Sequence, residues 1–184
     1  HLCDSPPANN FDDTFVKNGE SIIYPLVLDF CPNCFNIQLR HCLGEDLLYS
    51  NYSYVTPDTE SLENHYKDIL NYLKKNILNF NNLNIVEIGS NNGLLLNFLK
   101  PHVNSVLGIE PATNVANISK DAGIDVLNNF FTLDIAKDIS DRNIKLVIAR
   151  HMFAHNSDPK ELILGMKHLI GDDGFVLIEN AYAL

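Results

Sequence analysis

The sequence predicts an α/β fold, in which a parallel sheet flanked by helices follows a small β-rich unit that carries the cysteines. Two observations support this prediction. From residue 81 onward, short apolar strands alternate with amphipathic helices, the order that produces a parallel sheet. Residues 1–57 are instead turn-rich and aromatic, and they contain all four cysteines. We therefore expect two units of different construction.

The first unit, residues 1–57, contains an apolar run at 22–28. This run predicts one strand with Pro25 at an edge or a bulge, because proline has no N–H to donate to a neighbouring strand. The strand leads directly into Cys31. We therefore expect Cys31 and Cys34 at a hairpin-like turn.

Helical periodicity begins near Asp58. Six apolar residues share one face of a helix that runs to about Leu78: Leu62, Tyr66, Ile69, Leu70, Leu73 and Ile77. We assign residues 58–80 to a helix that links the two units. The Asn-rich stretch 79–84 predicts a loop, because Asn side chains compete for the backbone hydrogen bonds of a helix.

Residues 81–184 form the second unit. Strands are expected at 85–88, 106–109, 125–127, 145–149 and 175–178, and helices at 94–100, 113–122, 133–137 and 159–170. The last helix has the clearest boundaries, with Asp158 as N-cap, Pro159 in the first turn, Glu161 completing a capping box and Gly171 at the C-terminal end. Because the chain stops just after its last strand, we expect a truncated sheet in a piece of a longer protein.

The composition argues against two classes of partner. The formal net charge is −10 and only 13 residues are Lys or Arg, whereas nucleic-acid binders rely on clustered basic side chains. No window approaches the ~20 apolar residues that span a bilayer, and no secretory signal opens the chain. We therefore expect a cytoplasmic protein that binds neither nucleic acid nor membrane.

The turn after the first strand of the sheet carries the strongest functional signal. It places Glu87, Gly89, Ser90, Asn91 and Gly93 between an apolar strand and an apolar helix. Glycine lets a ligand approach the backbone, and a helix start presents unpaired N–H groups. A dinucleotide fingerprint needs a glycine where Asn91 stands, whereas E-x-G-x-x-x-G resembles the spacing of S-adenosylmethionine-dependent methyltransferases. The alternative is that both glycines only punctuate a loop.

A second carboxylate supports the same cofactor. The next strand, residues 106–109, ends at Glu110, which is placed to accept hydrogen bonds from both ribose hydroxyls of an adenosyl group. The alternative is a solvated acid at a strand end. A glycine turn together with this acid is a stronger pattern than either feature by itself.

Several separated segments agree with one family. They are Pro6–Phe11, Tyr24–Leu26, Cys31–Cys34, Tyr52–Tyr54, Val86–Gly93, Gly108–Ala112 and Ala154–His155. Together they resemble the nucleotide-sugar C-methyltransferases. The resemblance implies a zinc-binding head, a Rossmann-like domain that binds S-adenosylmethionine, and a third domain for the sugar nucleotide. We expect this third domain to be missing from this chain.

The resemblance also implies a zinc site made of two Cys-x-x-Cys pairs, since thiolates favour tetrahedral zinc. Cys31 and Cys34 match the second pair, and the first would precede His1. Cys3 and Cys42, with His41, are available substitutes but form no second pair and stay unassigned. The alternative for Cys31 and Cys34 is a pair of reduced cysteines in a turn.

Methylation of a carbon beside a ketone requires a base that removes a proton from that carbon. His155 follows the fourth strand and matches the family's Ala-His position, and an imidazole titrates near neutral pH. His151 is a weaker candidate. Tyr52 and Tyr54 resemble tyrosines near the sugar that donate to an enolate oxygen. The alternative for His155 is a structural role, and the alternative for Tyr52 and Tyr54 is aromatic packing.

The resemblance assigns further residues to the cofactor. Pro111 follows the ribose-binding Glu110, and Asn129 and Phe130 resemble the segment beside adenine, whereas Phe131 is expected in the core. Arg150, followed by His151, stands where the family commonly has asparagines, so we assign it to the cofactor or to a phosphate.

The leading interpretation is an S-adenosylmethionine-dependent C-methyltransferase acting on a keto-deoxysugar nucleotide, with structural zinc. Two alternatives remain open: methyl transfer to oxygen or nitrogen of another small molecule, and a cofactor-binding module without catalytic activity. Exchange of solvent deuterium into the substrate carbon would separate methyl transfer to carbon from methyl transfer to oxygen or nitrogen.

Overall fold

The computed structural model describes residues 1–7, 23–50 and 52–181. The chain divides into two compact units, His1–Tyr54 and Val55–Leu184. Residues 8–11 of the family segment and Ile22 of the expected first strand lie outside the described residues.

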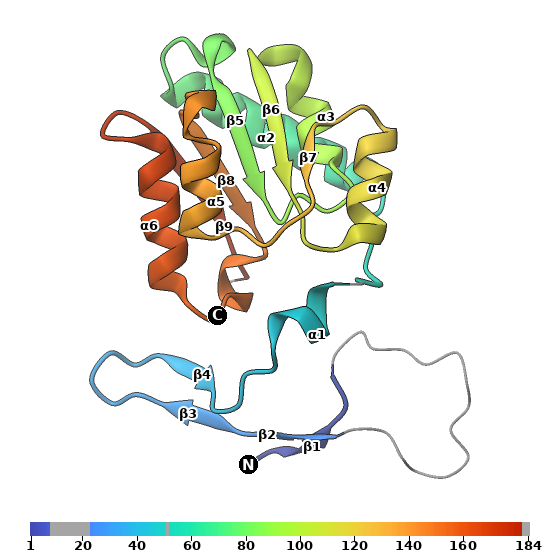
Figure 1. Ribbon diagram of the computed structural model, residues 1–184, viewed down its shortest axis with the longest axis vertical. Helices are drawn as coiled ribbons and strands as arrows, with labels where there is room; N and C mark the ends of the chain where they lie inside the picture. The colour runs from blue at the N-terminus through green and yellow to red at the C-terminus, as the bar shows by residue number, and fades with distance from the viewer. Residues whose placement is uncertain (8–22, 51, 182–184) are drawn as a thin grey trace. The chain divides into compact units, whose positions relative to one another are not determined.

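A five-stranded parallel sheet forms the centre of the second unit (Figure 1). Its strands are β5 (Asn84–Ile88), β6 (Ser105–Ile109), β7 (Val126–Leu127), β8 (Leu146–Arg150) and β9 (Phe175–Glu179). Each end lies within one residue of the range that the sequence predicts. The predicted α/β class with a parallel sheet is therefore confirmed.

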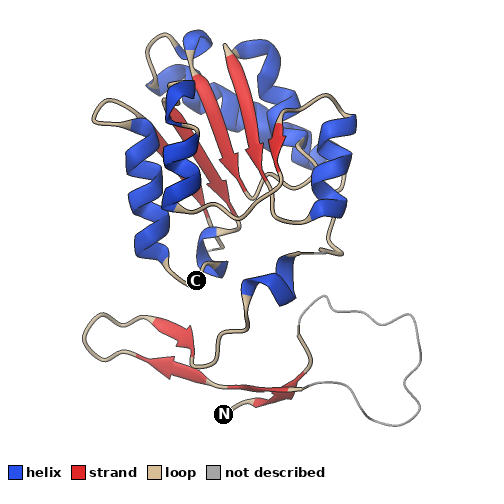
Figure 2. Cartoon of the chain, viewed as in Figure 1, coloured by secondary structure: helices blue, strands red, loops and turns tan. Residues whose placement is uncertain are grey.

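The strand order β7-β6-β5-β8-β9 places the first strand of this sheet in its middle. The chain runs outward from β5 to β6 and β7, returns to β8, and then runs outward to β9. All the strands point to one edge (Figure 2). The order reverses between β5 and β8, and ligands of open α/β sheets bind at the carboxyl ends of strands at such a switch point. We call the carboxyl ends of β5 and β8 the switch-point edge.

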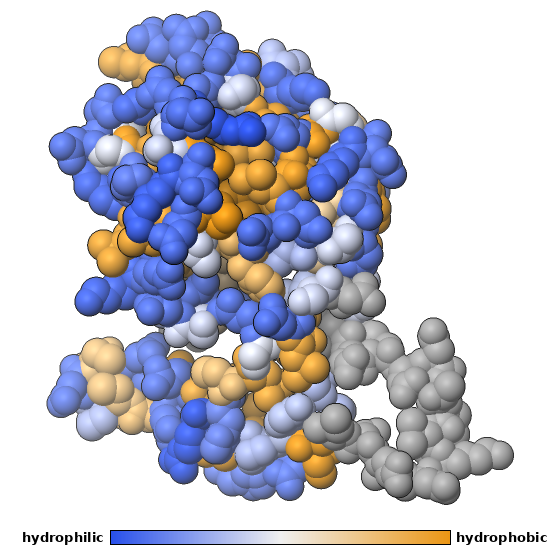
Figure 3. Space-filling model, viewed as in Figure 1, coloured by the Kyte–Doolittle hydropathy of each residue, from blue (hydrophilic) through white to orange (hydrophobic). Residues whose placement is uncertain are grey.

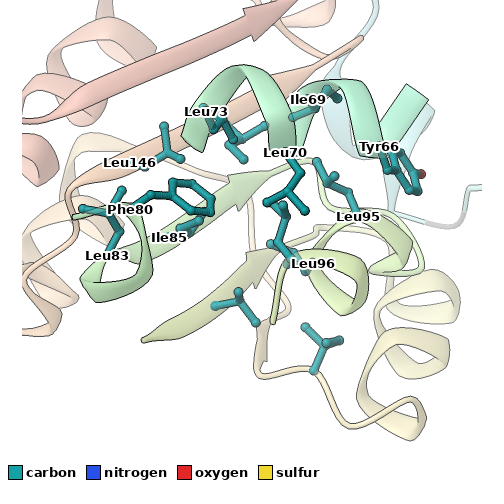
Figure 4. Close-up of a cluster of buried hydrophobic side chains, with 14 of the residues drawn as sticks. Tyr66, Ile69, Leu70, Leu73, Phe80, Leu83, Ile85, Leu95, Leu96 and Leu146 are labelled. Carbon is teal, nitrogen blue, oxygen red and sulfur yellow. The ribbon is translucent and has the colours of Figure 1, made fainter. Parts of the chain in front are cut away.

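Helix α2 (Glu60–Asn76) covers one face of this sheet. It begins at Thr59, whose side chain accepts a hydrogen bond from the backbone N–H of Leu62. Its buried face is formed by Tyr66, Ile69, Leu70 and Leu73, which pack with Leu95 and Leu96 of α3 (Leu94–Leu99) and with the strands (Figure 4). The helix expected to link the units therefore has its apolar face in the core of the second unit.

The opposite face of the sheet is covered by α5 (Leu133–Asp138) and α6 (Pro159–Ile170). Asp158 caps α6 as expected, because its carboxylate accepts from the N–H groups of Lys160 and Glu161. The expected capping box is wrong: the Glu161 carboxylate accepts from the N–H of Leu133, and the Asp158 N–H donates to Asn156. Glu161 thus ties α6 to the start of α5.

Shorter elements complete the second unit. Helix α4 (Thr113–Asp121) joins β6 to β7. Four turns of 3-10 helix lie in connections: η1 (Phe80–Asn82), η2 (Lys100–His102), η3 (Ser140–Arg142) and η4 (Phe153–His155). The expected loop at 79–84 therefore contains η1, and β5 starts at Asn84.

The first unit is built from two antiparallel strand pairs and one short helix, α1 (Glu45–Tyr49). Strand β1 (Cys3–Ser5) pairs with β2 (Tyr24–Leu26), and β3 (Leu28–Phe30) pairs with β4 (Ile37–Leu39). The single strand expected at 22–28 is wrong, because the chain changes partner at Val27. The Leu26 carbonyl accepts from the N–H of Leu2, and the Val27 carbonyl accepts from the N–H of Arg40.

Hydrophilic side chains cover much of the visible surface of the second unit, with apolar atoms between them (Figure 3). Strand β9 at the sheet edge leaves Phe175, Val176 and Ile178 between 40% and 45% exposed. In the part of the chain that the structure describes, no helix combines the length and apolar character needed to cross a bilayer.

Candidate functional site

The turn between β5 and α3 has a backbone conformation that favours glycine at two positions. Gly89 and Gly93 have φ angles of +68° and +75°, and Asn91 between them has +51°. A Cβ at Gly93 would collide with Ser119 Oγ, and one at Gly89 would lie 3.1 Å from Met152 Cβ. The spacing that sequence analysis singled out therefore reflects both backbone conformation and close packing.

Two asparagines of this turn hold the segment that precedes α2. Asn91 Oδ1 accepts from the backbone N–H of Thr56 at 2.8 Å and from that of Asn92 at 2.9 Å. Asn92 Nδ2 donates to the Thr56 carbonyl at 2.8 Å. The peptide groups around Thr56 are therefore bonded on both sides to the turn, which fixes its shape.

Glu110 joins the ends of β5 and β6. Its Oε2 accepts from the N–H of Asn91 at 2.8 Å, and its Oε1 accepts from the N–H of Ala112 at 2.9 Å. The side chain is 5% exposed. Burial raises the pKa of Glu110, while the N–H groups of Ala112 and Asn91 act to lower it. Each carboxylate oxygen has two lone pairs, so both retain capacity to accept from a ligand.

Glu87 and Arg150 form a buried ion pair at the switch-point edge. Arg150 Nε and Nη2 lie 3.0 and 2.9 Å from Glu87 Oε1, and the two side chains are 12% and 1% exposed. The guanidinium carbon also lies 5.1 Å from the ring centroid of Tyr66 on α2. Burial raises the pKa of the Glu87 carboxyl to about 7, with Arg150 opposing that rise. Arg150 thus has a protein carboxylate as partner.

Buried polar atoms remain at this edge without a hydrogen bond. Among the described residues, Glu87 Oε2 and Ser90 Oγ are buried and have no partner. Burying such atoms unpaired is costly, and ligand sites are a common reason for it. Ser90 Oγ packs against Gly108 of β6, so this hydroxyl is enclosed by the protein itself.

The comparison of sequences agrees with this geometry. Residues 59–183 match a family described as a methyltransferase domain. The chain belongs to this methyltransferase family. Membership of this family supports S-adenosylmethionine as the expected cofactor, and its binding at the glycine turn and Glu110 stays a prediction.

A curated relative of this methyltransferase domain is C-methyltransferase NovU of Streptomyces niveus. The two are 30% identical over 180 residues, which is 97% of this chain and 43% of the relative. The chain therefore spans less than half the length of the curated relative it matches.

Solved structures confirm the Rossmann-like fold of the methyltransferase domain. The YcgJ protein of Bacillus subtilis superposes with a TM-score of 0.51 at 16% identity, over 65% of this chain and 52% of its own. The cyclase SpnF superposes with a TM-score of 0.51 at 11% identity, over 70% of this chain and 50% of its own. At such identities the likeness shows the fold alone.

The structure gathers most of the predicted cofactor residues at the carboxyl edge of the sheet. These are Glu87, Gly89, Ser90, Asn91, Gly93, Glu110, Pro111 and Arg150. Asn129 and Phe130 follow β7 at the same edge, exposed and half-buried respectively, and Phe131 is buried as expected. Their roles toward the cofactor stay predictions.

Several residues with partners far along the chain were not predicted from the sequence. Asn128 donates to the carbonyls of Glu110 and Pro111 and so holds the turn after β6. Asn92, Tyr66 and Met152 were missed as well. Only Asn92, within the motif itself, had a sequence signal that could have identified it.

The remaining predicted residues lie in two other places. His155 is exposed in η4, four residues after His151. Tyr52 and Tyr54 belong to the first unit, where their rings pack edge to face with centroids 6.3 Å apart. Their catalytic roles stay predictions.

Cys31 and Cys34 lie in the turn of the β3–β4 hairpin, as expected. The Cys34 and Asn33 N–H groups, with the Cys34 side chain, lower the pKa of the Cys31 thiol. The cysteines at positions 3, 31, 34 and 42 are all free thiols. Within residues 1–7, 23–50 and 52–181, no group of three or more His, Cys, Asp or Glu side chains is arranged to hold a metal. The pair supplies two of the four ligands that structural zinc requires.

Proposed function

We propose that this chain is the cofactor-binding part of a C-methyltransferase that acts on a keto-deoxysugar attached to a nucleoside diphosphate. The observation that carries the proposal is the Glu110 carboxylate, which is held by two backbone N–H groups beside the glycine turn. Relationship to C-methyltransferase NovU supports carbon as the acceptor. The net charge of −10 supports a small-molecule substrate over a nucleic acid.

The geometry of the second unit and the family resemblance together support the following roles. Glu110 accepts from the ribose hydroxyls, and the backbone at Gly89 and Gly93 leaves room for the adenosyl group. Bound S-adenosylmethionine supplies an electrophilic methyl group on a sulfonium. The Glu87 and Arg150 pair lies buried at the same edge of the sheet. A histidine of the segment 151–155 removes the proton from the substrate carbon.

Calorimetry with S-adenosylhomocysteine tests the cofactor part of the proposal. Glu110→Ala and Glu110→Gln are each compared with the unaltered chain, and Glu63→Gln serves as the control because Glu63 is an exposed carboxylate on α2. Loss of the acceptor for the ribose hydroxyls is expected to cost about 1–3 kcal/mol of binding free energy. Equal affinity in all four proteins would contradict the ribose assignment.

We further propose that Cys31 and Cys34 bind structural zinc, with its remaining ligands outside this pair. The hairpin turn and the lowered pKa of the Cys31 thiol support thiolate ligation. Zinc content of the purified protein tests this proposal. Cys31→Ser is expected to abolish bound zinc, whereas Cys42→Ser is expected to retain it. An unaltered protein that binds no zinc would contradict the proposal.

A further inference from the structure

Glu179, the last residue of β9, holds two histidines from distant parts of the chain. Its carboxylate oxygens lie 3.0 and 3.1 Å from Nε2 of His65 on α2. Its Oε1 also lies 3.1 Å from Nε2 of His151, which follows β8 directly. One carboxylate therefore orients two imidazole rings through the same ring nitrogen of each.

The backbone at His151 is in a conformation that non-glycine residues rarely adopt. Its φ is +53°, and its N–H donates to the Glu179 carbonyl at 2.7 Å. The same two residues are thus joined both by main chain and by side chain. Left-handed backbone at a non-glycine residue costs free energy and concentrates at functional sites.

His151 lies next to the cofactor turn. Ile88 pairs with Ala149 across β5 and β8, so the chain leaves both strands at the same level. Met152, which follows His151, packs against Gly89. The imidazole is 61% exposed, so a substrate can reach it.

The charges around this imidazole come from three strands and one helix. Glu179 is its direct partner, Arg150 and Glu87 form the neighbouring ion pair, and His65 approaches Glu179 from α2. Partial burial acts to raise the pKa of Glu179. The hydrogen bond from His65 and the charges of His65, Arg150 and His151 outweigh that effect, so its pKa lies below the usual value. Glu179 is therefore an ionised acceptor near neutral pH.

We propose that His151, oriented by Glu179, is the general base of this methyltransferase, in place of the sequence candidate His155. The proposal rests on the proposed function. With Nε2–H donated to Glu179, Nδ1 of His151 accepts the proton from the substrate carbon. The C–H bond breaks, its electron pair moves into the adjacent carbonyl, and the products are an enolate and an imidazolium. Glu179 and His65 act as positioning residues, because a carboxylate partner fixes the tautomer of the ring and stabilises the imidazolium.

Nitrogen-15 NMR of the histidine rings tests the orientation without substrate. In the unaltered chain, the neutral ring of His151 is expected as the Nε2–H tautomer. In Glu179→Gln this ring is expected to shift to a mixture of the two tautomers, while that of His168, exposed on α6, stays unchanged. A dominant Nδ1–H tautomer of His151 in the unaltered chain would overturn the proposal.

Exchange of solvent deuterium into thymidine diphosphate-linked keto-deoxyglucose, with S-adenosylhomocysteine present, tests the chemistry. His151→Gln is expected to lower the exchange rate at least about 100-fold, and Glu179→Gln about tenfold, with unchanged affinity for S-adenosylhomocysteine. The control His168→Gln is expected to retain the rate. Loss of exchange in His155→Gln with retention in His151→Gln would overturn this assignment and leave the proposed function standing. Binding of S-adenosylhomocysteine without any exchange by the unaltered chain would overturn both the base and the carbon acceptor.

Discussion

At the scale of single residues, the Glu87 and Arg150 pair shows how burial at the edge of the sheet changes the pKa of a carboxyl group. Glu87 is 1% exposed, and only one of its oxygens receives hydrogen bonds from the guanidinium. Desolvation of a carboxylate favours its neutral form, and this effect outweighs the attraction of Arg150 in the resulting pKa of about 7. The carboxyl therefore changes its protonation close to neutral pH.

This pKa predicts a pH-dependent stability. Between the ordinary value of 4.5 and about 7, the folded protein retains a proton on Glu87 that the unfolded chain releases. The contribution of Glu87 to the free energy of unfolding therefore falls as pH rises through this interval, by about 3 kcal/mol at most. Glu87→Gln, which does not titrate, is expected to lack this fall in urea unfolding across that pH range. Parallel pH profiles of the two proteins would contradict the assignment.

The glycine turn gives a second prediction at this scale. Gly93→Ala introduces a Cβ into the side chains of Ser119 and Ile124 at a φ of +75°, so both packing and backbone strain oppose it. We expect a loss of about 3 kcal/mol in the free energy of unfolding. Gly123→Ala is the matched control, because its φ is +81° and nothing lies within 4 Å of the new Cβ. Backbone strain by itself is expected to cost about 1–2 kcal/mol there. Equal losses would show that packing at Gly93 is unimportant.

At the scale of elements, α2 both completes the core and supplies polar groups to the site. Its face of Tyr66, Ile69, Leu70 and Leu73 is buried in the second unit. From the same helix, the ring of Tyr66 lies beside Arg150 and His65 reaches Glu179. Displacement of α2 would therefore disturb the switch-point edge together with the core.

Truncation of α2 side chains tests this placement. Leu73 is 2% exposed, so Leu73→Ala is expected to lower the free energy of unfolding of the second unit by about 2–5 kcal/mol. Tyr72 is 62% exposed, and Tyr72→Ala is expected to change it by less than about 0.5 kcal/mol. Denaturant unfolding of both variants measures these two changes in the free energy of unfolding. A Leu73→Ala protein as stable as the unaltered one would indicate a helix that only links the units.

At the scale of the whole molecule, periodicity in the sequence predicted the sheet because each of its strands is a short apolar run bounded by polar residues. Gly89, Gly93 and Glu110 were predictable too, since local spacing encodes a turn and a strand end. The partners of Glu179 and Thr56 were not predictable, because they depend on where α2 and the strands meet in space. The division of the expected first strand at Val27 was not predictable either, because it depends on the pairing of β2 with β1 and of β3 with β4.

The proposed function depends on binding of an adenosyl group by the glycine turn and Glu110. A crystal structure of the chain with S-adenosylhomocysteine would show this binding. Both ribose hydroxyls are expected within about 3 Å of the Glu110 carboxylate oxygens, with the adenosyl group against the backbone of the turn between β5 and α3. A ligand bound away from that turn, with Glu110 bonded only to Asn91 and Ala112, would contradict it.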